Sequence, residues 1–565
     1  MLLSSATTSP CQSEKTAYTP STMHSDDHVA PKARFGGSRQ FTWYNFRICL
    51  LVSLGQLAFG YPASIIGTTM GQPSFLLYMR LVDPETFLPT GNASQLEGAM
   101  SAVFYAGSVC GALSSSFVMD RWGRKMSVVF CASISLFGGI FCCAAQNPPM
   151  FIVFRFFVGM GANAFVPVTG VYTSELAPPA LRGFFGGLNG VLILVGYSLA
   201  SYMGLAFFHA QNPVAQWRAP LGLALIFPTL MLLLLPIFPE SPRWLLLQGR
   251  AEEAEKVVQR LHQSGPNDDF ARSEFYQMRT QAEHDKNMPS SWKDLFMKPS
   301  YRRRAIIVIL IGAFGQASGV IVINNFSPMI YQALGFDVEE TLILLCGWIT
   351  GGIFASLIGA WLMDKWGRRP MIILGFGGCC LCLVVATIMI ALYASPVPDD
   401  PNRAGLGTAV AMLYLFIWIF AACLDNALVV YLPELFPNHI RAKGMSLGVA
   451  SLCLTDLILL QVTPTAMRTI GWKFYLVFIS VTAVAFVWAC LTIRETKGLP
   501  LEEIALLFGE GNEVTVLSTN IHVDHDNHNL VVAESGDVDY SDKGLEKVHA
   551  SHTKAESQPA KHVEG

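Results

Sequence analysis

Asp120-Arg121-Trp122-Gly123-Arg124-Lys125 is the stretch around which this chain is organised, and it returns as Asp364-Lys365-Trp366-Gly367-Arg368-Arg369. Each copy follows one long apolar run and precedes another. A short basic turn between two membrane-length segments has to lie in water, and Lys and Arg collect in the cytoplasmic loops of membrane proteins. We therefore expect both turns at the cytoplasmic ends of membrane-spanning helices.

A second pair of motifs repeats in the same order. Ser174-Glu175-Leu176 precedes Arg182-Gly183, and Pro433-Glu434-Leu435 precedes Arg441-Ala442-Lys443-Gly444 with the same spacing from Glu to Arg. Two kinds of motif that recur together predict two related halves in the same orientation, an arrangement found in carriers built from parallel repeats.

The composition favours a membrane protein. The chain has 565 residues, of which 52% are hydrophobic and 14% charged, whereas about 25% of the residues of a soluble domain are charged. The net charge of −3 gives no reason to expect nucleic-acid binding. The 13 Cys lie mostly inside apolar runs without metal-ligand spacing, so we interpret them as small buried hydrophobic residues. We expect no metal and no cofactor, and no nucleophile or phosphate motif indicates an enzyme.

The hydropathy pattern predicts an all-α integral membrane protein with twelve transmembrane helices in two six-helix bundles. Each apolar segment has at least the ~20 residues that cross a bilayer. The segments lie near residues 47–67, 98–119, 126–145, 150–172, 184–208, 218–238, 303–331, 342–363, 370–392, 406–432, 444–463 and 472–492. On this count the basic turns fall on the cytoplasmic side, as do both termini, and the acidic loops at Asp337 and Asp399 fall outside.

The same pattern divides the chain into five parts. We expect a disordered cytoplasmic tail over 1–44, the first bundle over 45–239, a cytoplasmic helical linker over 240–300, the second bundle over 301–493 and a largely disordered cytoplasmic tail over 494–565. Asn92-Ala93-Ser94 lies on a loop expected outside and makes Asn92 a candidate for N-glycosylation. We expect a monomer in the plasma membrane.

Five motifs, in one order and spacing over about residues 47–505, resemble the sugar porter branch of the major facilitator superfamily, fungal members included. They are the two basic turns, Pro239-Glu240-Ser241-Pro242-Arg243, Pro433-Glu434-Leu435-Phe436-Pro437 with its Arg441 segment, and Glu495-Thr496-Lys497-Gly498. The resemblance implies two bundles that rock about a central cavity, which opens to each side of the membrane in turn.

The resemblance also implies a set of gating residues at the cytoplasmic helix ends. The set is Asp120, Arg121, Arg124, Glu175, Arg182, Glu240, Arg243, Asp364, Arg368, Arg369, Glu434 and Arg441. Ion pairs among them would form when the inner gate is shut and separate when it opens, which biases a two-state equilibrium. The alternative is that these residues only anchor helix ends and set orientation.

The substrate site departs from the family. Of the amides in the family's sugar-binding run on the seventh span only the second Gln remains, as Gln316, and the Asn is replaced by Ile321. Family amides on the fifth and eighth spans fall at Gly190 and Gly352. An unpaired polar group costs about 1–3 kcal/mol, so the loss predicts extra room and a bulkier or less polar solute. The candidate ligands are Gln316, Asn189, Asn324, Asn325, Asn426 and Tyr331. Alternatively, some of these amides only hydrogen-bond between helices.

Proton coupling is the other open question. Arg155 on the fourth span matches a family Arg, but the Phe-Gly-Tyr-Asp run that supplies the proton acceptor is Phe59-Gly60-Tyr61-Pro62 here. Either transport is facilitated diffusion, with Arg155 satisfied by neutral groups, or coupling has moved. Asp425, Asp456 and Glu97 are the candidates for a moved acceptor, since burial makes a carboxylate easier to protonate. Alternatively, Asp425 and Asp456 form an internal hydrogen-bonded pair, or they balance the charge of a substrate, and neither residue transfers protons.

Three functions follow from these patterns. The first is a carrier for a small organic solute, a sugar or polyol by family resemblance. The second is a carrier that exports or imports a less polar metabolite, suggested by the lost sugar ligands. The third is a nutrient sensor that keeps the fold and signals through its tail without transport. The expected partners are the solute, the lipid bilayer and, where coupling has moved, protons.

Overall fold

The computed structural model describes residues 42–85, 89–178, 182–262, 269–285, 288, 291–393, 403–437, 439–497, 508, 521–523 and 530–532. The first half holds α1 (Trp43–Ser53), α2 (Gly55–Met70), α3 (Pro73–Tyr78), α4 (Ala93–Cys143), α5 (Pro148–Leu176), α6 (Arg182–Phe208), α7 (Pro213–Leu223), α8 (Ile226–Leu234) and the short turn η3 (Leu235–Ile237). The second half holds α13 (Pro299–Ala317), α14 (Val320–Ala333), α15 (Val338–Trp366), α16 (Arg368–Tyr393), α17 (Arg403–Ile419), η4 (Phe420–Asp425), α18 (Asn426–Glu434), α19 (Arg441–Thr469), η5 (Gly471–Phe474) and α20 (Tyr475–Thr492).

Four short helices lie between the two halves, in the region where the sequence predicts a helical linker. They are α9 (Pro242–Leu247), α10 (Ala251–His262), α11 (Asp269–Asp285) and α12 (Trp292–Met297). Beyond α20, β1 (Ile521–Val523) pairs antiparallel with β2 (Leu530–Val532). The prediction of a largely disordered tail did not include these strands, whose β-branched and apolar residues suit a strand. The rest of both tails lies outside the described residues.

Eleven segments of the described chain are long and apolar enough to cross a membrane. One of them, Ala93–Cys143, has 51 residues, or about 76 Å of helix, which is more than twice the ~30 Å hydrocarbon core of a bilayer. It breaks at Gly123, whose φ of 85° is not helical. The segment therefore holds two crossings, and the twelve predicted spans are confirmed.

Several spans consist of two helices with a break inside the membrane. Gly319, with φ 88°, separates α13 from α14, and the π-turn η4 interrupts the span from α17 to α18. Because such breaks free backbone groups, they are tolerated in a membrane where the backbone lines protein or a cavity. The π-turn ends at Asp425 and delivers Asp425 and Asn426 to the interface between the halves.

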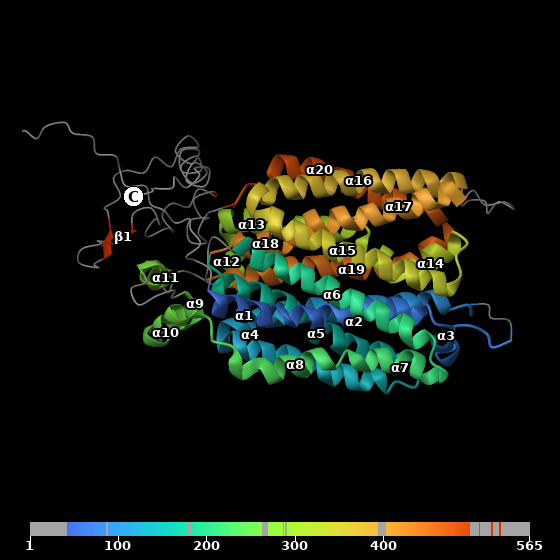
Figure 1. Cartoon of the computed structure of the whole chain (residues 1–565), viewed down its shortest axis with the longest axis horizontal. Helices are drawn as coiled ribbons and strands as arrows, with labels where there is room; N and C mark the ends of the chain where they lie inside the picture. The colour runs from blue at the N-terminus through green and yellow to red at the C-terminus, as the bar shows by residue number, and fades with distance from the viewer. Residues whose placement is uncertain are drawn as a thin grey trace, which may run out of the picture. The chain divides into compact units, whose positions relative to one another are not determined.

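The two halves lie along one another with their long helices side by side (Figure 1). Contacts between the halves run through α4 with α19, α6 with α15 and α2 with α14. The helices α9–α12 lie at one end of the bundles and α3 at the other (Figure 1). We call these the linker end and the opposite end.

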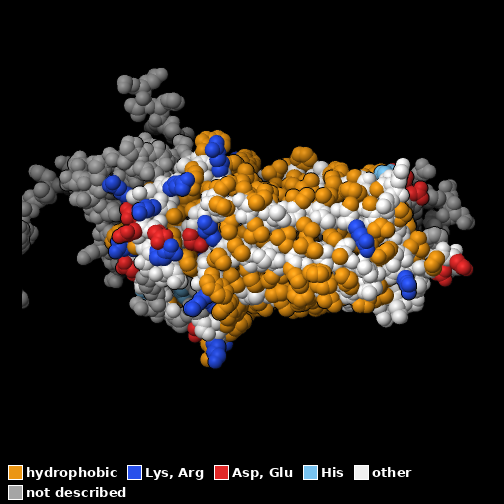
Figure 2. All heavy atoms as spheres, turned by 90° about the horizontal axis from the view of Figure 1, so that it is seen from below, with side chains coloured by type: hydrophobic (Ala, Val, Ile, Leu, Met, Phe, Trp, Pro, Cys, Tyr) orange, Lys and Arg blue, Asp and Glu red, His pale blue; other side chains and the backbone are white. Residues whose placement is uncertain are grey.

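The outer surface between the two ends is apolar. Figure 2 shows a broad band of hydrophobic side chains with Lys, Arg, Asp and Glu gathered chiefly at the linker end. Large apolar side chains elsewhere on the membrane-spanning helices, such as Leu491, Leu392 and Phe354, are also more than 60% exposed. A surface of this kind suits lipid, so the described chain has the architecture of a multi-pass membrane protein.

Candidate gates and translocation pathway

A buried ion pair holds the basic turn of the first half. Arg124 donates to both carboxylate oxygens of Glu175, through Nε at 2.8 Å and through Nη2 at 2.6 Å. Gly123 ends the preceding helix with its positive φ, so the backbone N–H groups of Arg124 and Lys125 start a new helix without helical partners. Glu240 accepts both, at 2.9 and 3.4 Å. A Cβ at position 123 would lie 2.8 Å from the Glu240 carboxylate, so glycine is required here for both its φ and its size.

The second half repeats this arrangement with different partners. Arg368 donates to both oxygens of Glu434, at 3.2 and 2.9 Å. Gly367, with φ 95°, ends α15. Glu495 accepts hydrogen bonds from the backbone N–H groups of Arg368 and Arg369, at 2.9 Å each. Glu495 therefore does in this half what Glu240 does in the first. The sequence indicated Glu240 as a gating residue and missed Glu495, although both glutamates directly follow the last span of their half.

An ion pair between described residues joins the halves at the linker end. Lys443 on α19 pairs with Asp120 on α4. Asp120 was predicted as a gating residue, whereas its partner was quoted only as part of a motif. Of the described contacts this pair matches a gate best, because it must break when the halves separate at this end.

The other predicted gating residues have different surroundings. Arg121 is exposed, Arg243 is buried, and buried Arg441 donates from Nε to the carbonyl of Pro433 at 3.1 Å. Arg369 is exposed and donates from Nη2 to the carbonyl of Cys490 at 3.1 Å. The side chains of Arg182 and Asp364 lie outside the described residues.

At the opposite end, Arg468 on α19 pairs with Glu97 on α4 at 3.1 Å and also bonds Ser94. Glu97, predicted as a candidate for proton coupling, thus lies in an ion pair at the end of the helix. On α14, Asn325 faces α2 closely, since a Cβ at Gly67 would lie 3.0 Å from the Asn325 carbonyl. The halves therefore touch at both ends.

At mid-depth, Arg155 on α5 has no described carboxylate as its partner. Its Nη2 donates to the backbone carbonyl of Pro62 at 2.8 Å, and the guanidinium lies 4.7 Å from the centre of the Phe104 ring. The side chain is 1% exposed, and its Nε finds no hydrogen-bond partner. The described contacts of Arg155 are thus with neutral groups, which leaves facilitated diffusion and a moved proton acceptor both open.

Asp456 on α19 is the most buried described carboxylate at this depth. It is 1% exposed, and its Oδ1 has no hydrogen-bond partner. Tyr105 lies close enough to interact electrostatically with both Asp456 and Arg155, and Tyr197 does so with both Asp425 and Asp456. Two aspartates of the second half and two tyrosines of the first thus lie near one another at the interface between the halves, and one of these tyrosines, Tyr105, also lies near Arg155.

An amide that the sequence did not single out lies beside this group. Asn163 on α5 donates from Nδ2 to the Cys453 sulfur at 2.6 Å, one turn before Asp456 on α19. It joins the two halves at mid-depth. The signal that could have found it is an amide inside an apolar span, which is rare and tends to have an interhelical partner.

The predicted substrate ligands fall into two groups. Asn426 is satisfied within its own half, since its amide exchanges hydrogen bonds with Ser356 at 3.1 and 2.7 Å. Each of the other five has at least one polar side-chain atom for which no hydrogen-bond partner is described. They are Asn189 (Oδ1), Asn324 (Oδ1), Asn325 (both amide atoms), Tyr331 (hydroxyl) and the half-buried Gln316.

The room expected from the lost amides is filled at two positions. A Cβ at Gly190 on α6 would lie 2.6 Å from Asn426 Oδ1 and 3.4 Å from Asp425 Oδ2. At Gly352 it would lie 3.2 Å from the side chain of Ile417. The prediction of free space beside Gly190 is therefore wrong in this conformation, because an amide and a carboxylate of the other half occupy it.

Comparison with known proteins agrees with this arrangement. The family profile described as "Sugar (and other) transporter" matches residues 48–508. The chain is 29% identical to a high-affinity glucose transporter of Kluyveromyces lactis over 82% of this chain and 84% of that protein. It is 28% identical to the probable polyol transporter 3 of Arabidopsis thaliana, over 86% and 96%, and 28% identical to the putative metabolite transport protein YwtG of Bacillus subtilis, over 80% and 92%.

Solved structures share the fold. The proton:xylose symporter XylE bound to 6-bromo-6-deoxy-D-glucose superposes with a TM-score of 0.71 at 23% identity, over 82% of this chain and 99% of that one. The inward open conformation of XylE from E. coli gives 0.61 at 22% identity, over 82% and 100%. The profile match and these likenesses establish that the chain is a membrane transporter of the sugar (and other) transporter family with the major facilitator fold.

Proposed function

We propose that this transporter carries a sugar or a polyol, and that it does so by alternating access between its two halves. The observation that carries the proposal is the pair of contacts between α4 and α19. Asp120–Lys443 joins the two helices at the linker end and Glu97–Arg468 joins them at the opposite end, with buried polar atoms that lack partners between them. Opening one contact at a time would expose that interior to one side of the membrane.

The cargo follows from the interior and from the relatives. Asn325, Asn324 and Tyr331 offer neutral donors and acceptors, which suit hydroxyl groups rather than an ionic solute. Relatives of this chain are named glucose and polyol transporters. A less polar cargo remains the second candidate, because Ile417 lies against Gly352, where the family has an amide.

We propose that the protein lies in the plasma membrane with its linker end and both termini on the cytoplasmic side. The five predicted parts of the chain keep their boundaries in this proposal. Cations gather there (Figure 2), as the positive-inside rule requires. Asn92 is exposed just before α4, at the end that would then lie outside. N-glycosylation at Asn92 tests this orientation: an endoglycosidase should shift the electrophoretic mobility of the wild type and leave Asn92→Gln unchanged.

The test of cargo is uptake of labelled hexoses and polyols by cells that lack their own hexose carriers, with surface expression measured in parallel. Saturable uptake supports the proposal. Protein at the surface without uptake of either class contradicts it and favours a less polar cargo, to be tried in both directions. Binding without flux of any solute would favour the sensor.

Proton coupling through Asp456, with Asp425 as its neighbour, is a second proposal. It is favoured by the buried Asp456, whose Oδ1 has no described hydrogen-bond partner. Tyr105 connects this carboxylate electrostatically to Arg155. Uptake that rises at acidic external pH supports coupling, and uptake that does not respond to pH supports facilitated diffusion.

A further inference from the structure

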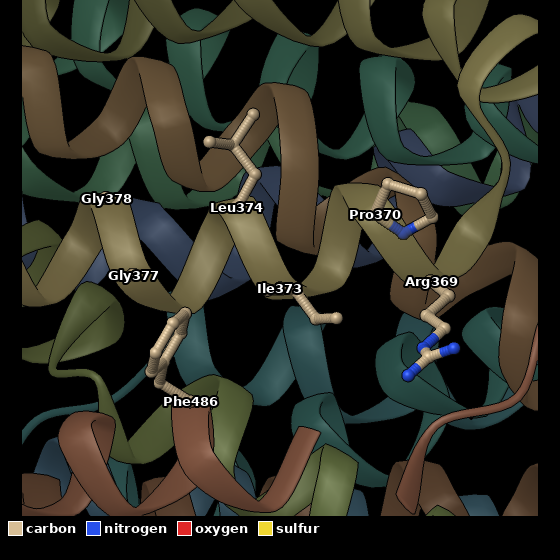
Figure 3. A pocket seen from close by; sticks show the side chains of 7 residues that line it. All are labelled: Arg369, Pro370, Ile373, Leu374, Gly377, Gly378 and Phe486. Atoms are coloured by element: carbon tan, nitrogen blue, oxygen red, sulfur yellow. The ribbon is translucent and has the colours of Figure 1, made fainter. Parts of the chain in front are cut away.

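A groove opens on the outer surface of the second half, between α16 and α20. It measures about 540 Å³, and its walls include Pro370, Ile373, Leu374 and Phe486. Figure 3 shows Ile373 and Arg369 pointing from α16 toward the side on which Phe486 of α20 lies. Gly377 lets the Phe486 ring approach α16, because a Cβ there would lie 3.1 Å from Phe486 Cε2. The groove is apolar apart from one charged residue, Arg369.

The position of the groove determines what can cover it. Leu374 is 50% and Phe486 is 37% exposed, and both lie on membrane-length apolar helices, where an exposed apolar side chain faces lipid. Arg369 and Gly378 are nine residues apart on α16, about 14 Å along the helix axis, which is close to half of the ~30 Å hydrocarbon core. The groove thus has the length of one leaflet and is suited to a lipid acyl chain.

The mouth of the groove lies at the level of the lipid headgroups. Trp361 and Trp366 on the preceding helix are 57% and 53% exposed, and exposed Trp residues gather at the membrane interface. The Lys365 ammonium lies 3.5 Å from the centre of the Trp361 ring, and Lys497 donates to the Lys365 carbonyl at 3.0 Å. Cations therefore collect on this side of the mouth.

Arg369 has capacity left for a ligand. Its guanidinium has five N–H donors, and one hydrogen bond of this group is described, from Nη2 to the carbonyl of Cys490. The nearby carboxylate of Glu495 is occupied by four backbone N–H groups, those of residues 368, 369, 496 and 497. The free donors of an arginine match the oxygens of a phosphate.

We propose that this groove is a binding site for an anionic phospholipid of the linker-end leaflet, with an acyl chain between α16 and α20 and the phosphate on Arg369. Charge complementarity selects the headgroup and the apolar walls select the chain. Basic pockets between membrane helices bind anionic headgroups by this combination.

Native mass spectrometry of the purified full-length protein tests the proposal. The protein is offered equal amounts of phosphatidylglycerol and phosphatidylcholine with identical chains, and the ratio of bound lipids is measured. Wild type should prefer phosphatidylglycerol. Arg369→Gln should lower that ratio about fivefold, as expected for one cation near the surface, while Arg369→Lys keeps most of the preference.

Two matched controls make the result decisive. Lys125 holds the position of Arg369 in the first half, so Lys125→Gln should leave the ratio unchanged. Ile373→Trp fills the groove and should lower retention of both lipids, whereas Leu381→Trp, on the exposed surface of α16 outside the groove, should not. The proposal fails if Arg369→Gln keeps the preference, if Lys125→Gln loses it equally, or if the two Trp variants retain the same amount of lipid.

Discussion

Arg155 donates a hydrogen bond to the backbone carbonyl of Pro62, 2.8 Å away, across the interface of α5 and α2. A neutral peptide group thus accepts a hydrogen bond from the buried guanidinium at the position where proton-coupled sugar porters, by the resemblance described above, carry an aspartate, and the Nε of Arg155 is left without a described partner. The consequence is that a proton acceptor for this chain has to lie elsewhere, or that none is used.

Restoring the carboxylate gives the first prediction. Pro62→Asp should raise the ratio of uptake at acidic pH to uptake at neutral pH relative to wild type, because the new carboxylate beside Arg155 can be protonated and deprotonated during the cycle. The measurement is labelled-solute uptake against external pH, normalised to surface protein. An unchanged ratio in a variant that still transports would show that the Arg155 site does not govern coupling.

The second prediction concerns Asp456. If coupling has moved to this residue, Asp456→Asn should remove the pH dependence of uptake and the ability to accumulate solute, while exchange of labelled for unlabelled solute continues. The amide keeps the size of the side chain and removes the titration, so loss of packing is not the cause. Asp425→Asn is the companion variant. Full pH dependence in the double variant Asp425→Asn, Asp456→Asn would exclude both residues.

The third prediction uses the two ion pairs that join α4 and α19. Cys453 is buried between the halves at mid-depth, so a membrane-impermeant maleimide added outside reaches it only when the opposite end opens. Glu97→Gln should speed this labelling and Lys443→Gln should slow it. Each partly exposed pair stabilises its closed end by about 1 kcal/mol or less, so the changes should be at most about fivefold.

Labelling of the Cys453→Ser variant defines the background from other cysteines. Arg250→Gln is the control for charge, since Arg250 and Glu253 form an exposed pair in the linker and should not affect the rate. Changes in the same direction for Glu97→Gln and Lys443→Gln would contradict the assignment of the two pairs to opposite gates.

The fourth prediction concerns the two glycines of the basic turns. Gly123→Ala and Gly367→Ala should each lower thermal stability, because both positions have positive φ and a Cβ there would meet the carboxylate of Glu240 or Glu495 at 2.8 and 2.5 Å. Both positions combine a positive φ with a ψ near 180°, a region that essentially only glycine adopts, and a residue held there costs about 1–3 kcal/mol. Gly222→Ala, in α7 with nothing within 4 Å of the added atom, should be neutral or stabilising. Thermal unfolding in detergent compares the three, and equal midpoints would contradict the argument.

Much of the fold could be predicted from the sequence because the bilayer acts on it directly. Apolar segments of membrane length, basic turns on one side and the repeated Asp-x-Trp-Gly motifs are local patterns, and the twelve spans lie where hydropathy placed them. The ion pairs Arg124–Glu175 and Arg368–Glu434 join residues that the sequence had already named as gating residues, since the repeat marks them twice.

The site itself was decided by the tertiary structure. Three of its features depend on contacts between residues that are far apart in the chain. Glu495 holds the second basic turn as Glu240 holds the first, Lys443 pairs with Asp120, and Asn426 fills the space beside Gly190. Hydropathy sets where a helix crosses the membrane but leaves its rotation and its depth against the other half undetermined. By itself, the sequence determined a two-part membrane transporter with basic turns at one end. Only the packing of α4 against α19 and of α6 against α15 decided which side chains face the interior. The rotation of each helix depends on contacts between the halves, whereas hydropathy reports only whether a segment lies in lipid or in water.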